Sequence, residues 1–284
     1  MTEFETILYE TPAEGVARIV QNRPKVRNAQ NLQMTYDINA AFDRACQDDS
    51  IRVIILAGSD PHFSSGHDMK AMGEQKPQKD FPVVGTWAGF ENEAAHGRFP
   101  LEREIFLDMV RRWRNVPKPT IAQVQGKCIA GGLMLAWACD IIVASDDAMF
   151  CDPVVAMGVC GVEYFAHPWE LGPRKAKELL FTAEWWSAQE AYRLGMVNHV
   201  VQREVLAEFT LDMAGKIARK PMFALKLTKE AVNNAVDVMG QRTAMDLAFS
   251  LHQLCHSHND QVHGVPVDPS GIPQAVKKEV KTEK

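Results

Sequence analysis

The sequence lacks a basic excess, a long apolar run and the pattern of a secretory signal in its first residues. Its formal net charge is −5, so no broad cationic surface for nucleic acid or an anionic membrane is expected. No uninterrupted apolar run approaches the ~20 residues that cross a bilayer. The acidic opening, residues 1–6, is not followed by an apolar stretch and is not typical of a secretory signal. We therefore expect a cytoplasmic protein with no nucleic-acid or membrane partner.

Cysteine patterns of the kind that hold disulfides or zinc are also missing. None of the six cysteines forms C-x-x-C, and most lie in apolar stretches, which indicates buried, reduced thiols. No carboxylate or cysteine falls at a familiar ligand spacing among four late histidines, which are His252, His256, His258 and His263. We interpret these histidines as a polar helix end and tail, and we expect no metal.

The chain has 284 residues, of which 46% are hydrophobic, enough for one large domain. Short β-rich runs alternate with helical patterns up to about residue 200; the runs are Val16–Val20, Val53–Ala57, Ile121–Val124 and Ile141–Ala144. Apolar side chains recur at helical spacing over residues 34–45, and Asn31 precedes them as the expected N-cap. Strands separated by helices predict an α/β core.

Three divisions of the chain are expected. Residues 1–202 form the α/β core, and residues 203–263 carry only helical patterns. A small helical region of this kind often packs on a neighbouring subunit. Residues 264–284, rich in proline and then lysine, predict a mobile tail. The segment 71–100 has no clear periodicity but contains aromatics, so it is either a loop over a binding site or a packed surface loop.

Two segments predict chemistry near a ligand. Phe63–Lys70, F-S-S-G-H-D-M-K, follows a buried strand, and its glycine allows the backbone to approach a ligand closely, although glycines between a strand and a loop are common for structural reasons alone. Gly126–Asp140 contains the pair Gly131–Gly132 at the start of an apolar helix. Free amide hydrogens at a helix start attract anions, although tight helix–strand packing explains such a pair equally well.

With two further motifs, the chain resembles the crotonase (enoyl-CoA hydratase/isomerase) superfamily over about residues 5–240. These motifs are R-P-K-V-R-N-A-Q-N at Arg23–Asn31 and S-A-Q-E-A-Y-R-L-G-M-V-N-H-V-V at Ser187–Val201. The resemblance implies a spiral of β-β-α repeats with a C-terminal helical trimerisation region. It also implies an acyl-CoA substrate, no cofactor besides the coenzyme A of that substrate, and a homotrimer or dimer of trimers.

The resemblance also implies a site. Two main-chain N–H groups, of His67 and Gly131, correspond to the oxyanion hole that stabilises negative charge on a thioester oxygen. We expect only the main chain of His67 to act there. The residues expected along the CoA are Lys25, Val26, Gly66, Asp68 and Lys70.

The sequence departs from the family at both hydratase glutamates, where Met134 and Val154 stand instead. Neither side chain transfers a proton, so ordinary hydration is not expected. Two carboxylates are candidates for this task. Asp152 precedes Val154 by two residues, although a capping carboxylate is the preferred interpretation of this residue. Glu163 lies one residue from the position where some family isomerases carry an aspartate. Further charged residues in or beside the 71–100 segment, which are His96, Glu102 and Glu104, are lid candidates.

The sequence thus predicts an acyl-CoA enzyme that stabilises an enolate, with isomerisation, hydrolysis or decarboxylation as alternatives to hydration. The rival hypothesis is a non-catalytic acyl-CoA binding protein that has kept the pocket. A dinucleotide-binding enzyme is disfavoured, because no G-x-G-x-x-G joins a strand to a helix.

Overall fold

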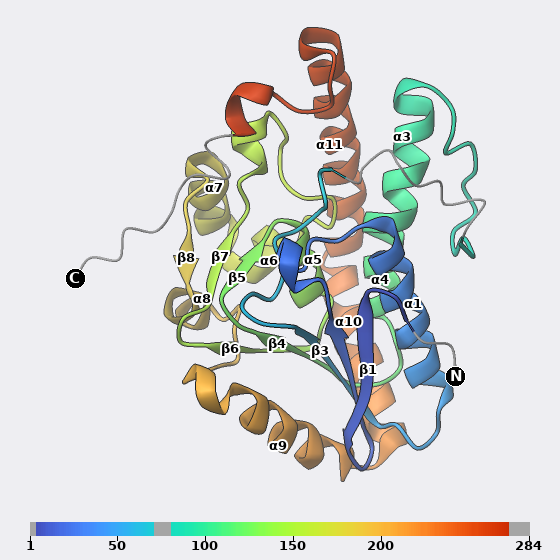
Figure 1. Ribbon diagram of the computed structural model, residues 1–284, viewed down its shortest axis with the longest axis vertical. Coiled ribbons are helices and arrows are strands. Elements are labelled where there is room, and N and C mark those ends of the chain that lie inside the picture. The colour runs from blue at the N-terminus through green and yellow to red at the C-terminus, as the bar shows by residue number, and fades with distance from the viewer. Residues whose placement is uncertain (1–3, 71–80, 273–284) are drawn as a thin grey trace.

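A computed structural model describes residues 4–70 and 81–272, whose strands form two sheets (Figure 1). The larger sheet has six strands in the order β1-β2-β3-β4-β6-β9, and the smaller has three in the order β5-β7-β8. The strands of the larger sheet are Ile7–Ala13, Val16–Gln21, Val53–Gly58, Thr120–Val124, Ile141–Ser145 and His199–Val201. Those of the smaller sheet are Lys127–Ile129, Met149–Cys151 and Trp186–Ser187.

The larger sheet is parallel from β2 to β9, and only the β1–β2 pair is antiparallel. Every residue of β3 and β4 is buried, as expected of parallel strands covered on both faces. The four strands predicted from the sequence are all present, each one residue longer than predicted. The strands that were not predicted are mostly short; β8 has two residues.

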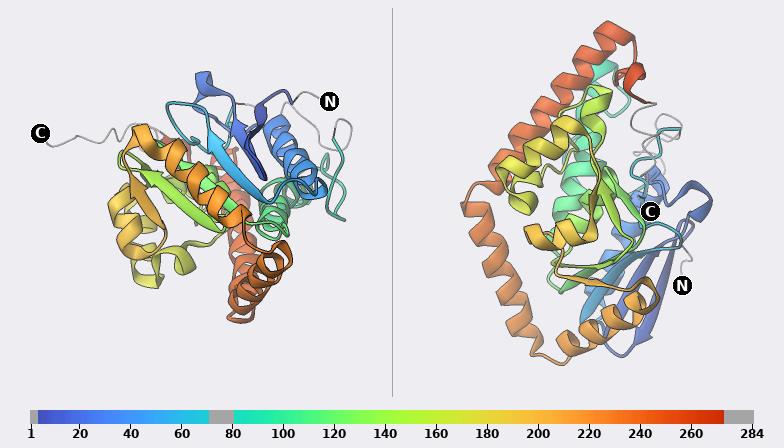
Figure 2. Two further views of the ribbon diagram at one scale, coloured as in Figure 1. Left: turned by 90° about the horizontal axis from the view of Figure 1, so that it is seen from below. Right: turned by 90° about the vertical axis from the view of Figure 1, so that its left-hand side faces the viewer.

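Helices cover both faces of this sheet. Helix α1, Leu32–Gln47, begins after Asn31, whose side chain accepts a hydrogen bond from the Met34 N–H, so the predicted cap is confirmed. The buried side of α1 joins the main core, and α9, Leu206–Ala218, crosses the opposite face of the sheet (Figure 2). The remaining core helices are α5 (Gly131–Trp137), α6 (His167–Leu171), α7 (Pro173–Thr182) and α8 (Ala188–Leu194). Four short 3-10 turns are Pro24–Val26, Val154–Met157, Arg203–Val205 and Pro269–Gly271.

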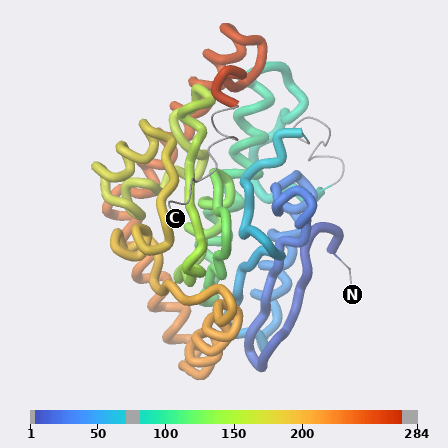
Figure 3. The backbone as a smooth tube through the Cα atoms, turned by 60° about the vertical axis from the view of Figure 1, so that its left-hand side comes forward, coloured from blue at the N-terminus to red at the C-terminus, as the bar shows by residue number. Residues whose placement is uncertain are grey.

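Two long C-terminal helices follow α9, as predicted. Helix α10, Met222–Val238, contains no buried residue among those described, and it exposes Phe223 and Val238 by 74% and 82%. Helix α11, Gln241–His263, ends at the last residue of the region predicted to be helical. It runs beside α3, Ala94–Glu102, at the end of the molecule opposite to α9 (Figure 3).

The 71–100 segment is only partly a loop. Residues 71–80 lie outside the described residues, whereas helix α3 begins at Ala94 and continues through a π-helical turn, Arg103–Asp108, into α4, Met109–Arg114. Gly97 and Pro100 lie within α3 and hide the helical pattern in the sequence. Phe81 stacks on Tyr36 with 4.5 Å between ring centroids, so this aromatic packs on the core.

Part of the predicted tail is folded. Residues 264–272 return to the core, where the Asp268 N–H donates to the carbonyl of Met157 and Val267 is buried. A mobile tail starting at residue 264 is therefore wrong for these residues; residues 273–284 lie outside the described part. Within residues 4–70 and 81–272, no helix combines the length and the apolar content that crossing a membrane requires.

Candidate active site

The two glycine-containing segments meet in the structure. The loop after β3 pairs with β5, because the Ile129 N–H donates to the Ser64 carbonyl over 3.0 Å. Gly66 has φ +87°, and a Cβ added there would lie 2.8 Å from the Ile129 carbonyl oxygen and 3.2 Å from the Gly131 nitrogen. Only glycine combines this backbone angle with so close an approach. The two segments therefore lie in direct contact.

The main-chain N–H groups of His67 and Gly131 are available to a ligand. The bridge between Gln30 and His67 uses the hydrogen bonds Gln30 N–H to Gly66 O and Asp68 N–H to Gln30 O, and neither involves the His67 N–H. Gly131 opens α5, where an N–H has no acceptor within the helix. Among residues 4–70 and 81–272, neither N–H donates a hydrogen bond.

The ring of His67 also belongs to this site. It stacks on Phe106 with 3.7 Å between ring centroids, and its Nε2 lies 3.2 Å from Oε2 of Glu163. A Cβ added to Gly131 would lie 2.7 Å from His67 Cε1 and 2.8 Å from its Nδ1. Nδ1 is buried and has no hydrogen-bond partner among the described residues. The ring therefore lies beside one of the two amides, whereas only the main chain of His67 was expected to act there.

Glu163 orients this ring. Its side chain is 4% exposed, and its other oxygen, Oε1, lies 3.5 Å from Nε2 of His252. Burial raises the pKa of Glu163, but the neighbouring His67 and His252 outweigh burial and hold the pKa well below its usual range. An ionised carboxylate only accepts hydrogen bonds, so His67 carries its proton on Nε2 and leaves a lone pair on Nδ1 when the ring is neutral.

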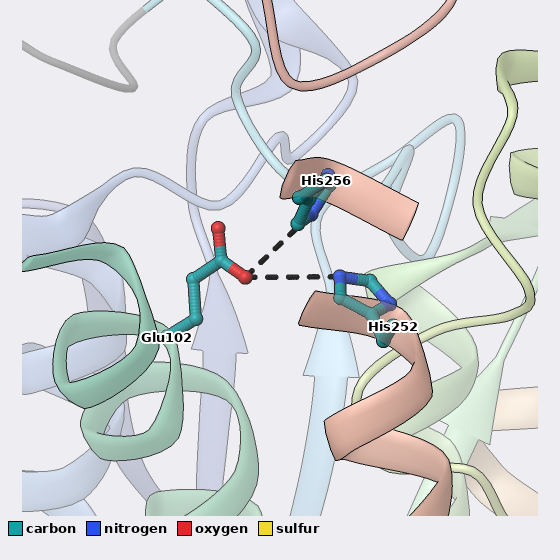
Figure 4. Close-up of side chains that lie close together, drawn as sticks. All are labelled: Glu102, His252 and His256. Atoms are coloured by element: carbon teal, nitrogen blue, oxygen red, sulfur yellow. Dashed lines mark ion pairs between the residues drawn. The ribbon is translucent and has the colours of Figure 1, made fainter. Parts of the chain in front are cut away.

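A second buried carboxylate lies behind Glu163. Glu102, at the end of α3, faces His252 and His256 of α11 (Figure 4). Its Oε2 lies 3.7 Å from Nε2 of His252 and 3.6 Å from Nε2 of His256, and it accepts a hydrogen bond of 2.5 Å from Gln253. Burial, and then the negative charge of Glu163, raise the pKa of Glu102 to about 8. Burial, and then His252, lower the pKa of His256 to about 4.

Asp152 has a different environment from Glu163. Its carboxylate accepts hydrogen bonds from the N–H groups of Val154 and Val162, at 3.3 and 3.1 Å, and lies 2.9 Å from Nε2 of His167. These are the contacts of a capping carboxylate. Met134 and Val154, at the two glutamate positions, are both buried.

Two of the three lid candidates, Glu104 and His96, contact neighbouring residues rather than the segments of Gly66 and Gly131. Glu104 accepts hydrogen bonds from the N–H groups of Val84 and Gly85, at 2.7 and 2.8 Å, and from the hydroxyl of Tyr36 at 3.4 Å. The His96 ring contacts the exposed side chain of Asn92. Glu102 alone of the three lies in the buried cluster.

The five residues expected along the CoA lie on two adjoining segments, the 3-10 turn Pro24–Val26 and the loop after β3. The Gln30 N–H donates to the Gly66 carbonyl at 2.8 Å, and the Arg23 guanidinium pairs with Asp68 at 2.9 Å. Asp68 therefore ties the segments together. The exposed members of the set are Lys25, Val26 and Lys70.

Sequence reasoning missed the participation of Phe106, His167 and the pair His252 and His256. The pair carried one usable signal, because histidines four residues apart lie on one face of a helix. Their carboxylate partner Glu102 comes from 150 positions earlier than His252 in the numbering, and only the packing of α11 on α3 brings the groups together.

Known proteins share this architecture and sequence. The family model for enoyl-CoA hydratase/isomerase matches residues 11–267. A provisionally named enoyl-CoA hydratase, EchA13, of Mycobacterium tuberculosis is 46% identical over 92% of this chain and 84% of its own length. A crystal structure of a probable enoyl-CoA hydratase from Mycobacterium smegmatis is 46% identical with a TM-score of 0.83, over 92% of this chain and 98% of that one. An enoyl-CoA hydratase/isomerase from Xanthobacter autotrophicus Py2 is 35% identical with a TM-score of 0.81, over 95% and 91%. The chain therefore belongs to the enoyl-CoA hydratase/isomerase family, a family of enzymes within the crotonase superfamily.

Proposed function

We propose that the chain binds an acyl-CoA thioester, stabilises its enolate with the N–H groups of His67 and Gly131, and moves a proton with the His67 ring. One observation carries the proposal. The ring packs against Gly131 while Glu163 holds its far nitrogen. A base and an N–H donor thus adjoin each other, as the formation of an enolate from a thioester requires.

The two N–H groups act on the thioester oxygen. Negative charge develops on this oxygen when the α-carbon loses a proton, and fixed donors stabilise that charge without reorganising. Removing one such donor typically costs about 2.7–4 kcal/mol of transition-state stabilisation. The availability of both N–H groups supports this role.

His67 acts as the proton-transfer group, and Glu163 is its positioning residue. With its proton on Nε2, the ring presents the Nδ1 lone pair on the Gly131 side. The ionised carboxylate stabilises the imidazolium that forms when Nδ1 takes a proton. Asp152 does not compete for this role, because its oxygens already bind two N–H groups and His167.

The reaction class that fits is double-bond isomerisation. Hydration in this family needs two carboxylates about the double bond, and here Met134 and Val154 occupy those positions. A single base that removes a proton and returns it to another carbon is sufficient for isomerisation. This chemistry uses no cofactor beyond the CoA of the substrate, whose phosphates and adenine lie along the segments of Lys25 and Lys70.

Self-assembly belongs to the same proposal. The exposed apolar residues of α10, which include Phe223 and Val238, are suited to burial in a homotrimer or a dimer of trimers.

A second candidate is acyl-CoA binding without turnover. The buried Met134 and Val154 favour this candidate, because they occupy the positions of the two family glutamates and cannot transfer a proton. The two candidates are separated by titrating purified protein with acyl-CoA thioesters and assaying a panel of enoyl-, dienoyl- and β-keto-CoA substrates. Isomerisation of an enoyl-CoA supports the enzyme proposal. Tight binding with no turnover of any substrate contradicts it.

A further inference from the structure

The buried cluster behind the active site has the composition of a metal centre. Glu102, His252 and His256 each present one donor atom, and these atoms all lie within 4.8 Å of one another (Figure 4). The two histidines are four residues apart on α11, so both rings lie on one face of the helix. Two histidines at this spacing with a carboxylate from another element form a well-known zinc ligand set.

Hydrogen bonds at the two Nδ1 atoms orient the rings of His252 and His256 as metal ligands. Nδ1 of His252 lies 2.7 Å from the Gly161 carbonyl oxygen, and Nδ1 of His256 lies 2.5 Å from that of Pro266. A carbonyl oxygen only accepts, so each ring carries a proton on Nδ1 and, when neutral, a lone pair on Nε2. This is the arrangement that orients ligating histidines in metal sites.

The Nε2 atoms of His252 and His256 face Oε2 of Glu102 at 3.7 and 3.6 Å. Nε2 of His252 is buried and has no hydrogen-bond partner among the described residues. Three acceptors that converge in a buried place require a cation or a shared proton. The Gln253 amide donates a hydrogen bond to the same carboxylate oxygen, as second-shell groups do for metal-bound carboxylates.

The distances match a metal of the size of zinc. Bonds of about 2.0–2.2 Å at a tetrahedral angle separate two donor atoms by about 3.3–3.6 Å. The observed separations from Glu102 Oε2 are 3.7 Å to His252 and 3.6 Å to His256. The two Nε2 atoms lie within 4.8 Å of each other, so side-chain adjustments of about 1 Å would bring all three donors around one ion.

We propose that Glu102, His252 and His256 bind one divalent ion of the zinc class, with a fourth position open toward Glu163. Oε1 of Glu163 lies 3.5 Å from Nε2 of His252, within reach of the ion or of a water bound to it. The ion ties α3 to α11, and its charge lies next to the carboxylate that positions His67. Imidazole and carboxylate ligands favour zinc, cobalt and nickel over magnesium or calcium.

The test is metal binding by full-length, tag-free protein that has been dialysed against a chelator. Titration with Co²⁺ should give one ion per chain, with the visible bands of a low-coordinate nitrogen and oxygen site and without an intense sulfur-to-cobalt band. Zn²⁺ should displace the Co²⁺ and raise the melting temperature. Because losing a second-shell partner already costs about 10–100-fold in affinity, Glu102→Gln and His256→Gln should each weaken binding at least 100-fold.

His258→Ala is the matched control, because His258 lies on the same helix and is exposed; it should bind Co²⁺ as the parent does. Glu102→Gln keeps the size of the side chain and an acceptor for Gln253, so it decides the matter even if the histidine variant does not fold. The absence of stoichiometric Co²⁺ and Zn²⁺ binding overturns the proposal, and so does binding that both variants retain. Either result would leave a shared proton as the link between these groups.

Discussion

Nε2 of His67 lies 3.2 Å from Oε2 of Glu163, although 96 positions separate the two residues in the chain. The pairing puts a buried carboxylate behind a ring whose other nitrogen lies beside Gly131. A residue expected to act through its main chain alone therefore also supplies a candidate base.

Replacing the ring while keeping its main chain should stop proton transfer. His67→Gln retains the N–H of the proposed oxyanion hole and a side chain of similar volume. We expect kcat to fall about 10²–10⁴-fold, the usual contribution of a positioned acid or base, with a small change in KM. Steady-state isomerisation kinetics measure both constants, with His258→Ala as the control. Full activity in His67→Gln would confine His67 to a main-chain role.

Removing the charge of Glu163 should alter the pH profile as well as the rate. The pKa of Glu163 is held well below its usual range, so the carboxylate stays ionised across the working pH range. In Glu163→Gln the negative charge that favours the protonated ring is gone. We expect the acidic limb of the kcat/KM profile to move to lower pH and the plateau to fall at least 10-fold, about 1.4 kcal/mol. A lower rate with an unmoved limb would indicate a purely structural role.

Gly66 should tolerate alanine far less well than a glycine with a similar backbone angle. Gly66 and Gly195 have φ of +87° and +85°, but a Cβ meets the Ile129 carbonyl at 2.8 Å in the first case and open space in the second. Both substitutions carry a strain cost of about 1 kcal/mol. Gly66→Ala should in addition displace the loop and weaken acyl-CoA binding. Denaturant unfolding and calorimetric titration compare the two variants; equal effects in both would contradict this account of the loop.

Asp152 should matter for stability rather than for chemistry. Asp152→Asn weakens the buried contacts with two N–H groups and His167, so the free energy of unfolding should fall by about 1–3 kcal/mol. The rate per folded molecule should stay close to that of the parent. Asp212→Asn, on the surface of α9, is the matched control and should stay within about 0.5 kcal/mol. A large loss of kcat with unchanged stability would return Asp152 to the catalytic candidates.

The fold was largely predictable because its signals are local. The strands Val53–Gly58 and Thr120–Val124 are continuous buried runs, and the cap at Asn31 lies next to its helix. Helix α3 was missed because glycine and proline interrupt its pattern, and its terminal carboxylate was therefore placed in a loop.

The sequence located candidate site residues only where short motifs mark main-chain groups. The positions of His67 and Gly131 follow from short motifs, and the close approach of Gly66 to the Gly131 nitrogen brings the two motifs together in the structure. The partners of the His67 ring do not follow from any motif, because each comes from a segment that is distant in the sequence and reaches the ring only through tertiary packing. Glu163, Glu102 and His252 come from three separate segments that meet through the packing of α11 on α3.

The most direct measurement is exchange of α-carbon protons in D₂O, followed by mass spectrometry on a saturated acyl-CoA that binds the protein. The account predicts deuterium incorporation that depends on the parent protein, is lost in His67→Gln and is retained in His258→Ala. No incorporation above the rate without protein, under conditions where the thioester is bound, would contradict the formation of an enolate at this site.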